Sequence, residues 1–569
     1  MYINTNEFKE NTYDAIVVGS GISGGWAAKE LTEKGLKVLV LERGRNIEHV
    51  KDYKTALTPP WEFPHADRPT QEMIAKQPIQ NRTGFVVTES THQHFVNDLE
   101  NPYLETKRFD WIRGYHVGGR SLMWGRVSLR WSDIDFEANL KEGIGIDWPI
   151  RYKDIAPWYD YAEKFAGVCG NRDGLPHLPD GQFQPPIEMS CAEDYFSKEI
   201  RTKFDNRYVI HGRGAHLTKP TKEQTDLGRA SCQSRNLCMR GCPFGAYFSS
   251  QAATLPAARR TGNLTIRPHS IVNSIIYDEQ KGKAKGVRVI DEQTGKWHEF
   301  YAKIVFLNAS ALGSTFILLN SISKRFPNGM DDSGQLGHNV MDHHFRIGAY
   351  GELYKFQDKY YKGSNPVGSY VPRYRNIGND KRDYLRGFGY ETGASRSRGT
   401  NDDDLAFGGD FKNRETEVGN WSVSLSAFGE CLPYYENKVE LSKEITDKWG
   451  QPVLKMDAEF KENEMKMRID MKNDAAEMLE KTGFKNVGTY DEASYPGLGI
   501  HEMGMARMGK DPKTSVLNKW NQVWGAKNVF VTDGAFMTSA SCVNPSLTYM
   551  AMTARAADYA VKELRKGNL

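Results

Sequence analysis

Residues 13–42 read YDAIVVGSGISGGWAAKELTEKGLKVLVLE, and this stretch decides the fold. It opens with an apolar, β-branched run that ends at Gly19, which is typical of a buried strand. Residues 23–34 are rich in helix-forming side chains and are closed by Gly35. The run LKVLVL at 36–41 predicts a second buried strand. Strand, helix and strand within about thirty residues make a βαβ unit with a parallel sheet.

The first turn of this unit carries a glycine-rich pattern, Gly19-x-Gly21-x-x-Gly24. Glycines at these places allow a tight turn, close approach of the backbone to a pyrophosphate, and close packing of helix on strand. The helix then presents unpaired N–H groups and its positive dipole end to the phosphates. Glu42 ends the second strand, where its carboxylate binds a ribose hydroxyl and disfavours a 2′-phosphate. The pattern therefore predicts NAD or FAD, and not NADP, over a merely glycine-rich turn.

Composition places the chain among folded proteins large enough for several cores. Its 569 residues contain 75 Lys and Arg against 72 Asp and Glu, and a net charge of +3 calls for neither nucleic acid nor an anionic membrane. The most apolar segment, residues 304–319, is interrupted by polar residues and glycine, whereas a membrane span needs about 20 mostly apolar residues. Residues 1–12 lack the apolar core of a signal peptide, so the chain by itself reads as cytoplasmic.

Two kinds of structure alternate along the rest of the chain. Alternating runs at 271–306 predict β-hairpins, and residues 346–451, with the run WSVSLSAF, predict a large antiparallel sheet. Residues 461–482 predict an amphipathic helix. NVFVTDG at 528–534 predicts one more strand, and a final helix follows it. The segments that build the two structures therefore interleave.

Three of the seven cysteines, Cys232, Cys238 and Cys242, lie within one short, basic, loop-like stretch. An odd number of cysteines in a chain of this size argues against a disulfide framework. Thiolates at this density bind soft metals. Zinc would require a fourth ligand, and the segment holds no histidine or further cysteine. The residues alone leave open an iron–sulfur cluster, zinc and plain buried thiols.

Further blocks, together with the glycine pattern, resemble the glucose–methanol–choline (GMC) flavoprotein oxidoreductases. They are RGYHVGGRSLMWGR at 113–126, NASALGSTFILLNS at 308–321, LGHNVMDHH at 336–344, HEMGMARMG at 501–509 and VTDGAFMTSASCVNPSLTYMAMTARAA at 531–557. The resemblance spans nearly the whole chain in the order of the family. It implies an enzyme that oxidises an alcohol to a carbonyl by hydride transfer to FAD.

The resemblance also implies a mixed α/β fold in which two domains interleave. One is a Rossmann-like FAD-binding domain, expected at residues 8–130, 225–345 and 495–569, with the cysteine loop at 228–248. The other is a substrate domain built on a large antiparallel sheet flanked by helices, expected at residues 131–224 and 346–494.

His501 and Asn544 match the catalytic pair of the family. A neutral imidazole is the usual acceptor for the hydroxyl proton that leaves during hydride transfer, and the amide of Asn544 would hold the same oxygen. Asn544 and Pro545 are also expected to cap and start the terminal helix, whose positive end would then face the flavin. His343 and His344 are expected only to pack or to form hydrogen bonds.

The resemblance implies a set of residues in contact with FAD. They are Gly19, Gly21, Gly24, Glu42, Gly118, Gly119, Ser121, Trp124, Val272, Ala309, Asp533, Gly534 and Asn544. Some relatives link the flavin to a histidine just before the tryptophan of the glycine-rich loop, but Met123 stands at that place here. His116 is not expected to replace it, so FAD is expected to be noncovalent.

Certain sugar dehydrogenase subunits of this family look similar in the cysteine spacing, and in them the thiolates hold a 3Fe–4S cluster. The resemblance thus implies that Cys232, Cys238 and Cys242 bind such a cluster, which passes electrons from FAD to a cytochrome c. It also implies a small partner subunit that carries an export signal and takes this chain to the periplasm.

We expect the substrate to be a sugar or a glycoside. Residues 148–170 and 427–441 look most like glucoside 3-dehydrogenases, and their many Trp and Tyr residues suit stacking on sugars or, alternatively, a core. Gluconate 2-, fructose and glucose dehydrogenases and an oxygen-using sugar oxidase are the alternatives. A gluconate site would need convergent arginines, for which Arg346, Arg373 and Arg375 are candidates. A non-catalytic redox sensor with a zinc or thiol switch is the alternative from another class.

Overall fold

The N-terminal strands lie at the centre of an eight-stranded sheet in the computed structural model, which describes residues 11–360, 365–398 and 407–569. Residues 8–10 of the first expected domain segment lie outside this part. In order along the sheet the strands are β16 (Gln522–Val523), β17 (Ala526–Val531), β8 (Trp297–Leu307), β1 (Thr12–Val18), β2 (Val38–Leu41) and β5 (Leu264–Arg267). β7 (Lys283–Asp291) pairs with β8, and β6 (Ser270–Asp278) pairs with β7.

The centre of this sheet is parallel and covered on both faces, which is why its strands are apolar throughout. β1 pairs in parallel with both β2 and β8, and every residue of β2 is buried. A parallel sheet requires helices on its faces because its crossover connections run there. The expected βαβ unit and hairpins are therefore confirmed.

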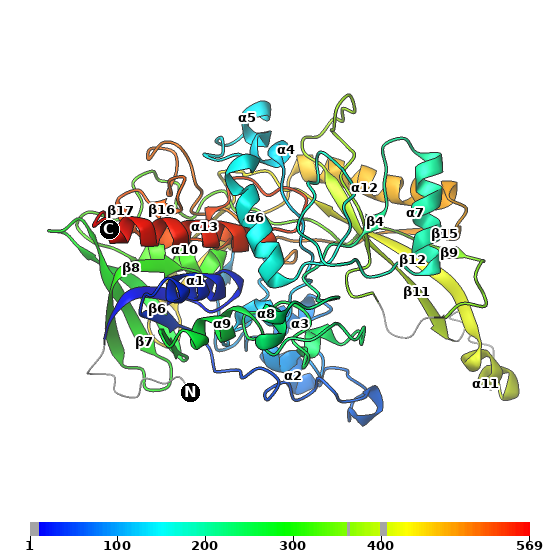
Figure 1. Cartoon of the computed structure of the whole chain (residues 1–569), viewed down its shortest axis with the longest axis horizontal. Coiled ribbons are helices and arrows are strands. Elements are labelled where there is room, and N and C mark those ends of the chain that lie inside the picture. Colours follow the sequence, from blue (N-terminus) through cyan, green and yellow to red (C-terminus); the bar gives the residue numbers. More distant parts are fainter. Residues whose placement is uncertain (1–10, 361–364, 399–406) are drawn as a thin grey trace.

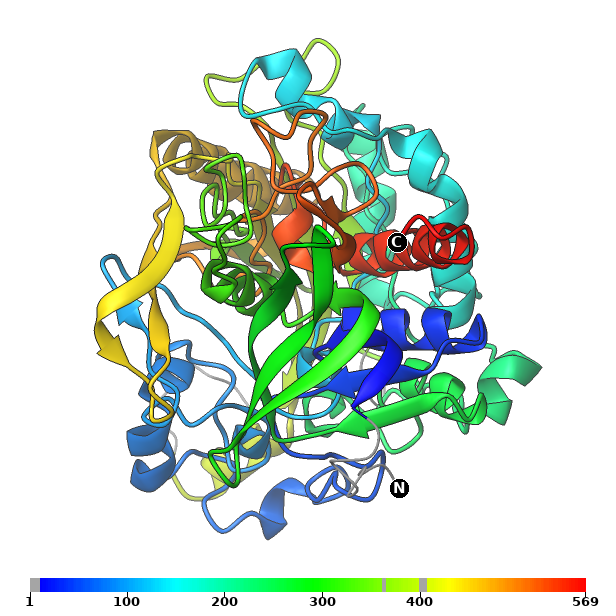
Figure 2. The same ribbon diagram turned by 90° about the vertical axis from the view of Figure 1, so that its left-hand side faces the viewer.

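Helices pack against one another beside this sheet. α1 (Ile22–Glu33) contacts α9 (Thr254–Arg260) and the terminal helix α13 (Ser546–Arg565), and α13 contacts α6 (Tyr152–Ala166). Figures 1 and 2 show α1, α13 and α6 side by side. α10 (Ala311–Asn320) packs on β6. Trp26 of α1 is fully buried and meets Phe165 of α6 edge-on at 5.2 Å, so these helices share one core.

The second sheet is the large antiparallel one that the sequence predicts, and it lies at the opposite end of the molecule in Figure 1. Its order is β15 (Lys485–Asp491), β9 (Ile347–Leu353), β12 (Val418–Gly429), β11 (Phe388–Arg398), β10 (Ser369–Val371) and β4 (Ile210–His211). One face is covered by α12 (Glu462–Lys481), whose Met467, Met471 and Met478 are fully buried. Burial of each such side chain stabilises the fold by about 1.5–3 kcal/mol.

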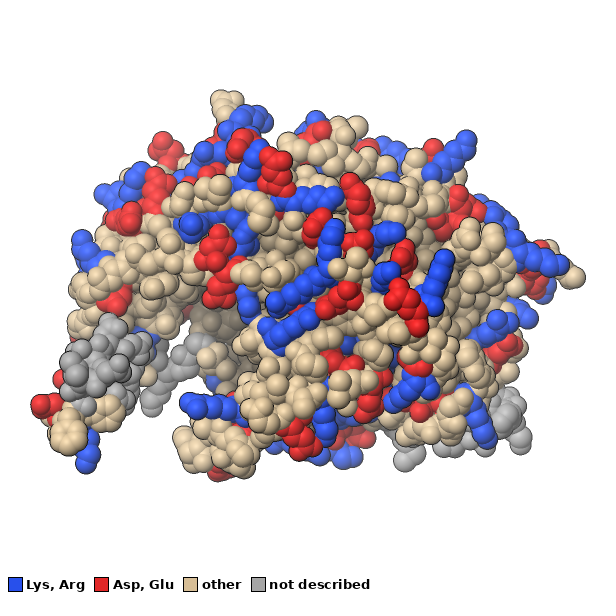
Figure 3. All heavy atoms as spheres, turned by 180° about the vertical axis from the view of Figure 1, so that it is seen from behind, with Lys and Arg blue, Asp and Glu red and all other residues tan. Residues whose placement is uncertain are grey.

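A small third sheet and several short helices complete the described structure. The sheet contains β13 (Lys438–Thr446), β14 (Pro452–Asp457) and β3 (Leu104–Glu105). The remaining α-helices of the described residues are α2 (Gln71–Lys76), α3 (Pro78–Arg82), α4 (Asp133–Phe136), α5 (Ala138–Glu142), α7 (Cys191–Lys203), α8 (Lys222–Asp226) and α11 (Gly409–Thr416). Basic and acidic side chains are interspersed over the face in Figure 3. Within the described ranges, no helix combines the length and the apolar character needed to cross a membrane.

The fold class is confirmed, since a Rossmann-type sheet and an antiparallel sheet are built from interleaved segments. Trp131, Trp148 and Tyr159 are buried in one core cluster with residues of the first sheet, so Trp148 and Tyr159 follow the core alternative and do not form a sugar-stacking surface. One local expectation is corrected. The terminal helix has Pro545 as its N-cap, and the side chain of Asn544 does not cap it.

Candidate active site

A cavity of about 520 Å³ lies where the first sheet faces the second. It opens at the carboxyl ends of β1, β2 and β8, with Gly19, Glu42 and Asn308 among its lining residues. Ligands of open parallel sheets bind at this edge of the sheet. The opposite side of the cavity includes Glu391 of β11 and Phe428 of β12. Both sheets therefore contribute residues to one site.

The glycine pattern shapes the nucleotide end of the cavity. A Cβ on Gly24 would lie 2.0 Å from the carbonyl oxygen of Gly19, and one on Gly19 would lie 2.3 Å from that of Asn308, so both glycines are required for packing. A Cβ on Gly21 would meet no protein atom within 4 Å. Gly21 is the N-cap of α1, and no side chain caps that helix. The open space and the free N–H groups of the first turn fit the pyrophosphate of FAD.

Glu42 connects three segments at this end. Its carboxylate accepts hydrogen bonds from the backbone N–H of Ser20 (3.1 Å), the hydroxyl of Ser20 (2.5 Å) and the N–H of Gly44 (3.0 Å). The same Ser20 hydroxyl accepts from the N–H of Gly118 at 2.8 Å. Burial raises the pKa of Glu42, although these hydrogen bonds act in the opposite direction. The carboxylate is held at the cavity wall, where a ribose hydroxyl fits.

Most residues expected to contact FAD line this cavity. They are Gly19, Gly21, Glu42, Gly119, Ser121, Trp124, Val272, Ala309, Asp533, Gly534 and Asn544. Gly24 does not line it and acts through packing. Gly118 also lies behind the wall, in the left-handed conformation (φ +89°), and a Cβ there would collide with Gln251. Met123 lines the cavity, whereas His116 does not.

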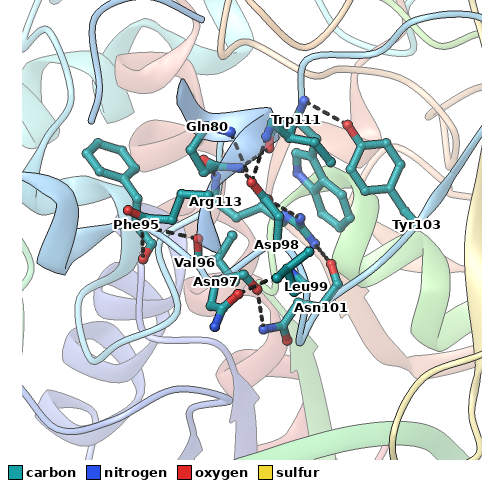
Figure 4. Close-up of polar contacts among 12 residues, drawn as sticks. Gln80, Phe95, Val96, Asn97, Asp98, Leu99, Asn101, Tyr103, Trp111 and Arg113 are labelled. Atoms are coloured by element: carbon teal, nitrogen blue, oxygen red, sulfur yellow. Dashed lines mark hydrogen bonds and ion pairs between the residues drawn. The ribbon is translucent and has the colours of Figure 1, made fainter. Parts of the chain in front are cut away.

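The wall formed by residues 95–113 is held by buried charges (Figure 4). Asp98 accepts hydrogen bonds from the guanidinium of Arg113 at 2.9 Å and the amide of Gln80 at 3.0 Å. Arg113 also donates to the carbonyl of Asn101 at 2.7 Å, and both of these residues line the cavity. Asp98 and Arg113 are both buried, and breaking such a pair costs about 3–5 kcal/mol. This wall is therefore preorganised.

Near the other end, three groups form a hydrogen-bonded chain that fixes the protonation of His501. The carbonyl oxygen of Ser541 lies 2.9 Å from Nε2 of His343, and Nδ1 of His343 lies 2.9 Å from Nδ1 of His501. A carbonyl only accepts, so Nε2 of His343 carries the proton and its Nδ1 is an acceptor. Nδ1–H of His501 then donates to it, and Nε2 of His501 is left with a free lone pair. His501 lines the cavity.

The electrostatic surroundings keep His501 neutral. Burial, followed by His343 and Arg120, lowers its pKa well below 6.5. Arg120 itself forms a two-fold ion pair with Glu502, with N–O distances of 2.9 and 2.7 Å. The free base form of His501 therefore persists at neutral pH, as a proton acceptor requires.

The loop before His501 is strained and is held by one carboxylate. Ile500 adopts φ +61°, which is unfavourable for a β-branched residue. Asp342 accepts hydrogen bonds from the N–H groups of Gly497, Gly499 and His501 at 2.7, 3.0 and 3.0 Å. Burial raises the pKa of Asp342 to about 7, with a contribution from Glu502. The three amide contacts compensate the strain and fix the position of the imidazole.

Asn544 lies in the same cavity and contacts a residue that the sequence did not indicate. Its side-chain N–H donates to Oε1 of Glu391 at 3.1 Å. The hydrogen bond crosses from the C-terminal segment to the second sheet. Nothing in the local sequence of β11 distinguishes Glu391 from a surface glutamate, which is why sequence reasoning missed it. His343, which was expected only to pack or to form hydrogen bonds, is the direct partner of His501.

The three clustered cysteines are free and half-buried. Burial raises the pKa of Cys232 and Cys238, and both thiols also interact electrostatically with Cys242. Among the described residues, no three His, Cys, Asp or Glu side chains converge as ligands of a metal ion. Tertiary packing brings a fourth thiol close to the cysteine loop: Cys169 is fully buried and interacts electrostatically with Cys232. Met239, inside the cysteine loop, lines the cavity, so loop and cavity are adjacent.

The candidate arginines for a carboxylate substrate do not form a site. Arg346, Arg373 and Arg375 are absent from the cavity lining. Arg375 is paired with Asp474 at 2.5 Å, and Arg346 donates to the carbonyl of Thr83. These side chains stabilise the structure around the second sheet.

Sequence profiles described as GMC oxidoreductase match residues 13–345 and 433–553, and the chain belongs to this family. It is therefore an FAD-dependent oxidoreductase acting on alcohol or sugar hydroxyl groups, which confirms the expected enzyme class. Among its relatives is the 2-methyl-1,2-propanediol dehydrogenase of Mycolicibacterium austroafricanum, 29% identical over 566 residues (96% of this chain, 94% of that protein). Another is the fructose dehydrogenase large subunit of Gluconobacter japonicus, 27% identical over 571 residues (97% and 98%). The formate oxidase structure from Aspergillus oryzae shares the fold, with a TM-score of 0.57 at 15% identity, covering 98% of this chain and 99% of that one.

Proposed function

We propose that this protein is the catalytic chain of an FAD-dependent dehydrogenase that oxidises a secondary hydroxyl of a sugar or glycoside, with C3 of glucosides as the preferred position. A 3Fe–4S cluster held by Cys232, Cys238 and Cys242 would supply the route for its electrons to a cytochrome c. A small subunit with an export signal brings the chain to the periplasm.

The observation that carries the proposal is the free Nε2 of His501 in the same cavity as the side chain of Asn544. Bound FAD supplies the acceptor for a hydride from the substrate carbon. The hydroxyl proton moves to Nε2 of His501, which is neutral because burial, His343 and Arg120 lower its pKa. Asn544 offers its remaining amide hydrogen to the same oxygen and orients the C–H bond. The pair thus provides a base and an orienting donor for alcohol oxidation.

The number of thiols in the cysteine loop suits a three-iron cluster better than zinc. A single zinc ion needs four ligands, and the loop supplies three cysteines and no histidine. A three-iron cluster would take one thiolate for each iron, so Cys232, Cys238 and Cys242 would be enough to hold it. The N–H of Ser234 donates to Sγ of Cys232 at 3.5 Å, a type of contact that tunes such clusters. The loop borders the cavity through Met239, which favours electron exchange between them.

A second candidate is the oxidation of a small vicinal diol. The relative at 29% identity is a 2-methyl-1,2-propanediol dehydrogenase, and it covers nearly the whole chain. A glucoside and a short diol share the motif of two adjacent carbons that carry oxygen, so both fit the same catalytic pair.

The deciding experiment uses the complete protein purified without oxygen. Absorption and low-temperature EPR spectra are recorded before and after addition of methyl glucoside, and separately after 2-methyl-1,2-propanediol. Flavin bands that bleach with the glucoside, together with the EPR signal of an oxidised three-iron cluster, support the proposal. Bleaching only with the diol selects the second candidate. If the flavin bleaches, no iron is present and oxygen is consumed without another acceptor, the protein is an oxidase and not a dehydrogenase. If the purified protein contains no flavin, the proposed function is overturned.

A further inference from the structure

The second sheet places one acidic side chain in the substrate end of the cavity. Glu391 pairs with Ser426 across β11 and β12, so it lies on the same face of the sheet as Phe428, two residues further along. Glu391 and Phe428 both line the cavity. Tyr390, the preceding residue, is buried in the core on the other face. The strand alternation therefore directs the Glu391 side chain to the cavity face of the sheet.

Glu391 has a single donor in the described structure. Asn544 donates to its Oε1 at 3.1 Å, and no ion pair to Glu391 is formed within the described residues. Burial raises the pKa of Glu391, whereas the hydrogen bond from Asn544 and the nearby cation Arg126 act in the opposite direction. The guanidinium of Arg126 is already engaged by the carbonyl of Trp124 and, at 3.4 Å, by Nε2 of His216. Oε2 of Glu391 is thus available as an acceptor.

The side-chain amide of Asn544 relates the reacting oxygen of the substrate to the carboxylate of Glu391. An amide nitrogen has two hydrogens. One is donated to Glu391, and the proposed function assigns the other to the oxygen whose proton moves to His501. The reacting oxygen and the carboxylate are therefore neighbours on one amide group. A hydroxyl on the carbon next to the reacting one is the substrate group that reaches Oε2.

We propose that Glu391 is the specificity residue for a vicinal diol: it accepts a hydrogen bond from the hydroxyl adjacent to the one oxidised, and it disfavours substrates with a carboxylate at that position. This inference rests on the proposed function and narrows it. It selects polyols, glycosides and short 1,2-diols over simple alcohols and 2-hydroxy acids. Phe428, whose ring stacks on Phe345 at 5.1 Å, provides the apolar surface for the C–H groups of the same substrate.

The test compares substrates that differ only at the adjacent position. Wild type, Glu391→Gln and Glu391→Ala are assayed with propane-1,2-diol, propan-2-ol and lactate, and each variant is checked for its flavin content. Glu352→Gln on β9 serves as the control variant, because Glu352 belongs to the same sheet but not to the cavity lining. A hydrogen bond to a charged group contributes enough that Glu391→Ala is expected to lower kcat/KM for the diol about 10- to 100-fold. Propan-2-ol lacks the second hydroxyl, so its loss, which comes only from the altered hold on Asn544, should be at least ten-fold smaller than the loss for the diol.

Glu391→Gln keeps an acceptor for Asn544 but removes the charge. This variant is expected to have a smaller ratio of kcat/KM for propane-1,2-diol to kcat/KM for lactate than the wild type has. Equal losses for diol and mono-alcohol would overturn the inference, because Glu391 would then act only by holding Asn544. If Glu391→Ala fails to fold, the Glu391→Gln substrate ratios decide.

Binding gives a readout that is independent of turnover. Pinacol is a vicinal diol whose two carbons carry no hydrogen, so it binds without being oxidised. Its binding, followed by the change in flavin absorption, is expected to weaken about ten-fold or more in Glu391→Ala, whereas binding of tert-butanol, which has one hydroxyl, should weaken much less. If Glu391→Ala binds pinacol as tightly as the wild type does, the inference is contradicted, even if the enzyme oxidises diols. A wild type that bleaches with no alcohol or sugar overturns the proposed function instead.

Discussion

Nδ1 of His501 lies 2.9 Å from Nδ1 of His343, although 158 residues separate them in the chain. The contact continues through His343 Nε2 to the carbonyl of Ser541. This direction of donation leaves Nε2 of His501 unprotonated. The protonation state of the base is therefore set by a backbone carbonyl two groups away.

Replacement of His501 is expected to remove the proton acceptor and to leave cofactor binding intact. His501→Gln should lower kcat by about 10²- to 10⁴-fold, the usual contribution of a positioned general base. The measurement is stopped-flow bleaching of the flavin by substrate, with flavin content per protein as the control. Normal bleaching in this variant would mean that another group accepts the proton.

His343 is expected to act as a positioning residue for His501. His343→Phe removes the acceptor for Nδ1–H, so about 10- to 100-fold in kcat/KM should be lost. Because His343 contributes to lowering the pKa of His501, its removal should raise that pKa. Activity that depends on the neutral imidazole would then begin to fall at a higher pH on acidification. The pH profile of kcat/KM checks this, and an unshifted acid limb would show that His343 is only structural.

Ser541 is held in an unfavourable conformation, with φ +57°, and its hydroxyl donates to Asp135 at 2.6 Å. Ser541→Ala loses this bond while the strain remains, and is expected to lower the free energy of unfolding by about 1–3 kcal/mol. Ser541→Gly loses the same bond but relieves the strain of the left-handed conformation, so it should be less destabilised by about 1 kcal/mol. Urea unfolding of the two variants measures the difference. Equal stabilities would contradict the strained backbone.

The glycine turn offers a matched pair of substitutions. In Gly24→Ala the new methyl group would lie 2.0 Å from the carbonyl of Gly19, so the strand–helix packing must shift and the protein should be strongly destabilised. In Gly21→Ala the methyl group meets no protein atom and enters the space assigned to the pyrophosphate. We expect normal stability of the cofactor-free protein but weak FAD binding. Thermal unfolding with and without FAD separates the two, and tight FAD binding by Gly21→Ala would refute the assigned phosphate position.

Removal of one thiol tests the cysteine loop. Cys238→Ser should lose most of its iron, measured against protein, while substrate still bleaches the flavin under anaerobic conditions. Reduction of an added cytochrome c should fall with the iron content. Cys431→Ser, at a buried thiol far along the chain from the loop, is the control and should retain its iron. Full iron content in Cys238→Ser, or zinc in place of iron, would contradict the cluster.

Several features could be predicted because neighbouring residues determine them. The first βαβ unit, the hairpins and the helix at 461–482 follow from hydrophobic periodicity and glycine placement, and the structure has α12 at Glu462–Lys481. The resemblance named His501 and Asn544, and the structure places both in one cavity. The N-cap of the terminal helix was predicted one residue early, because Asn544 engages Glu391 and not the helix.

The sequence by itself determined the nucleotide-binding turn, the two types of sheet and the family, since each depends on local periodicity or on motifs read along the chain. Only the tertiary structure decided that Glu391 meets Asn544, 153 residues away, and that Asp135 reaches Ser541. Strand alternation and sheet register place Glu391 on the cavity face, and no local pattern encodes which distant segment will face it. The specificity and protonation of the site are therefore properties of the packed sheets.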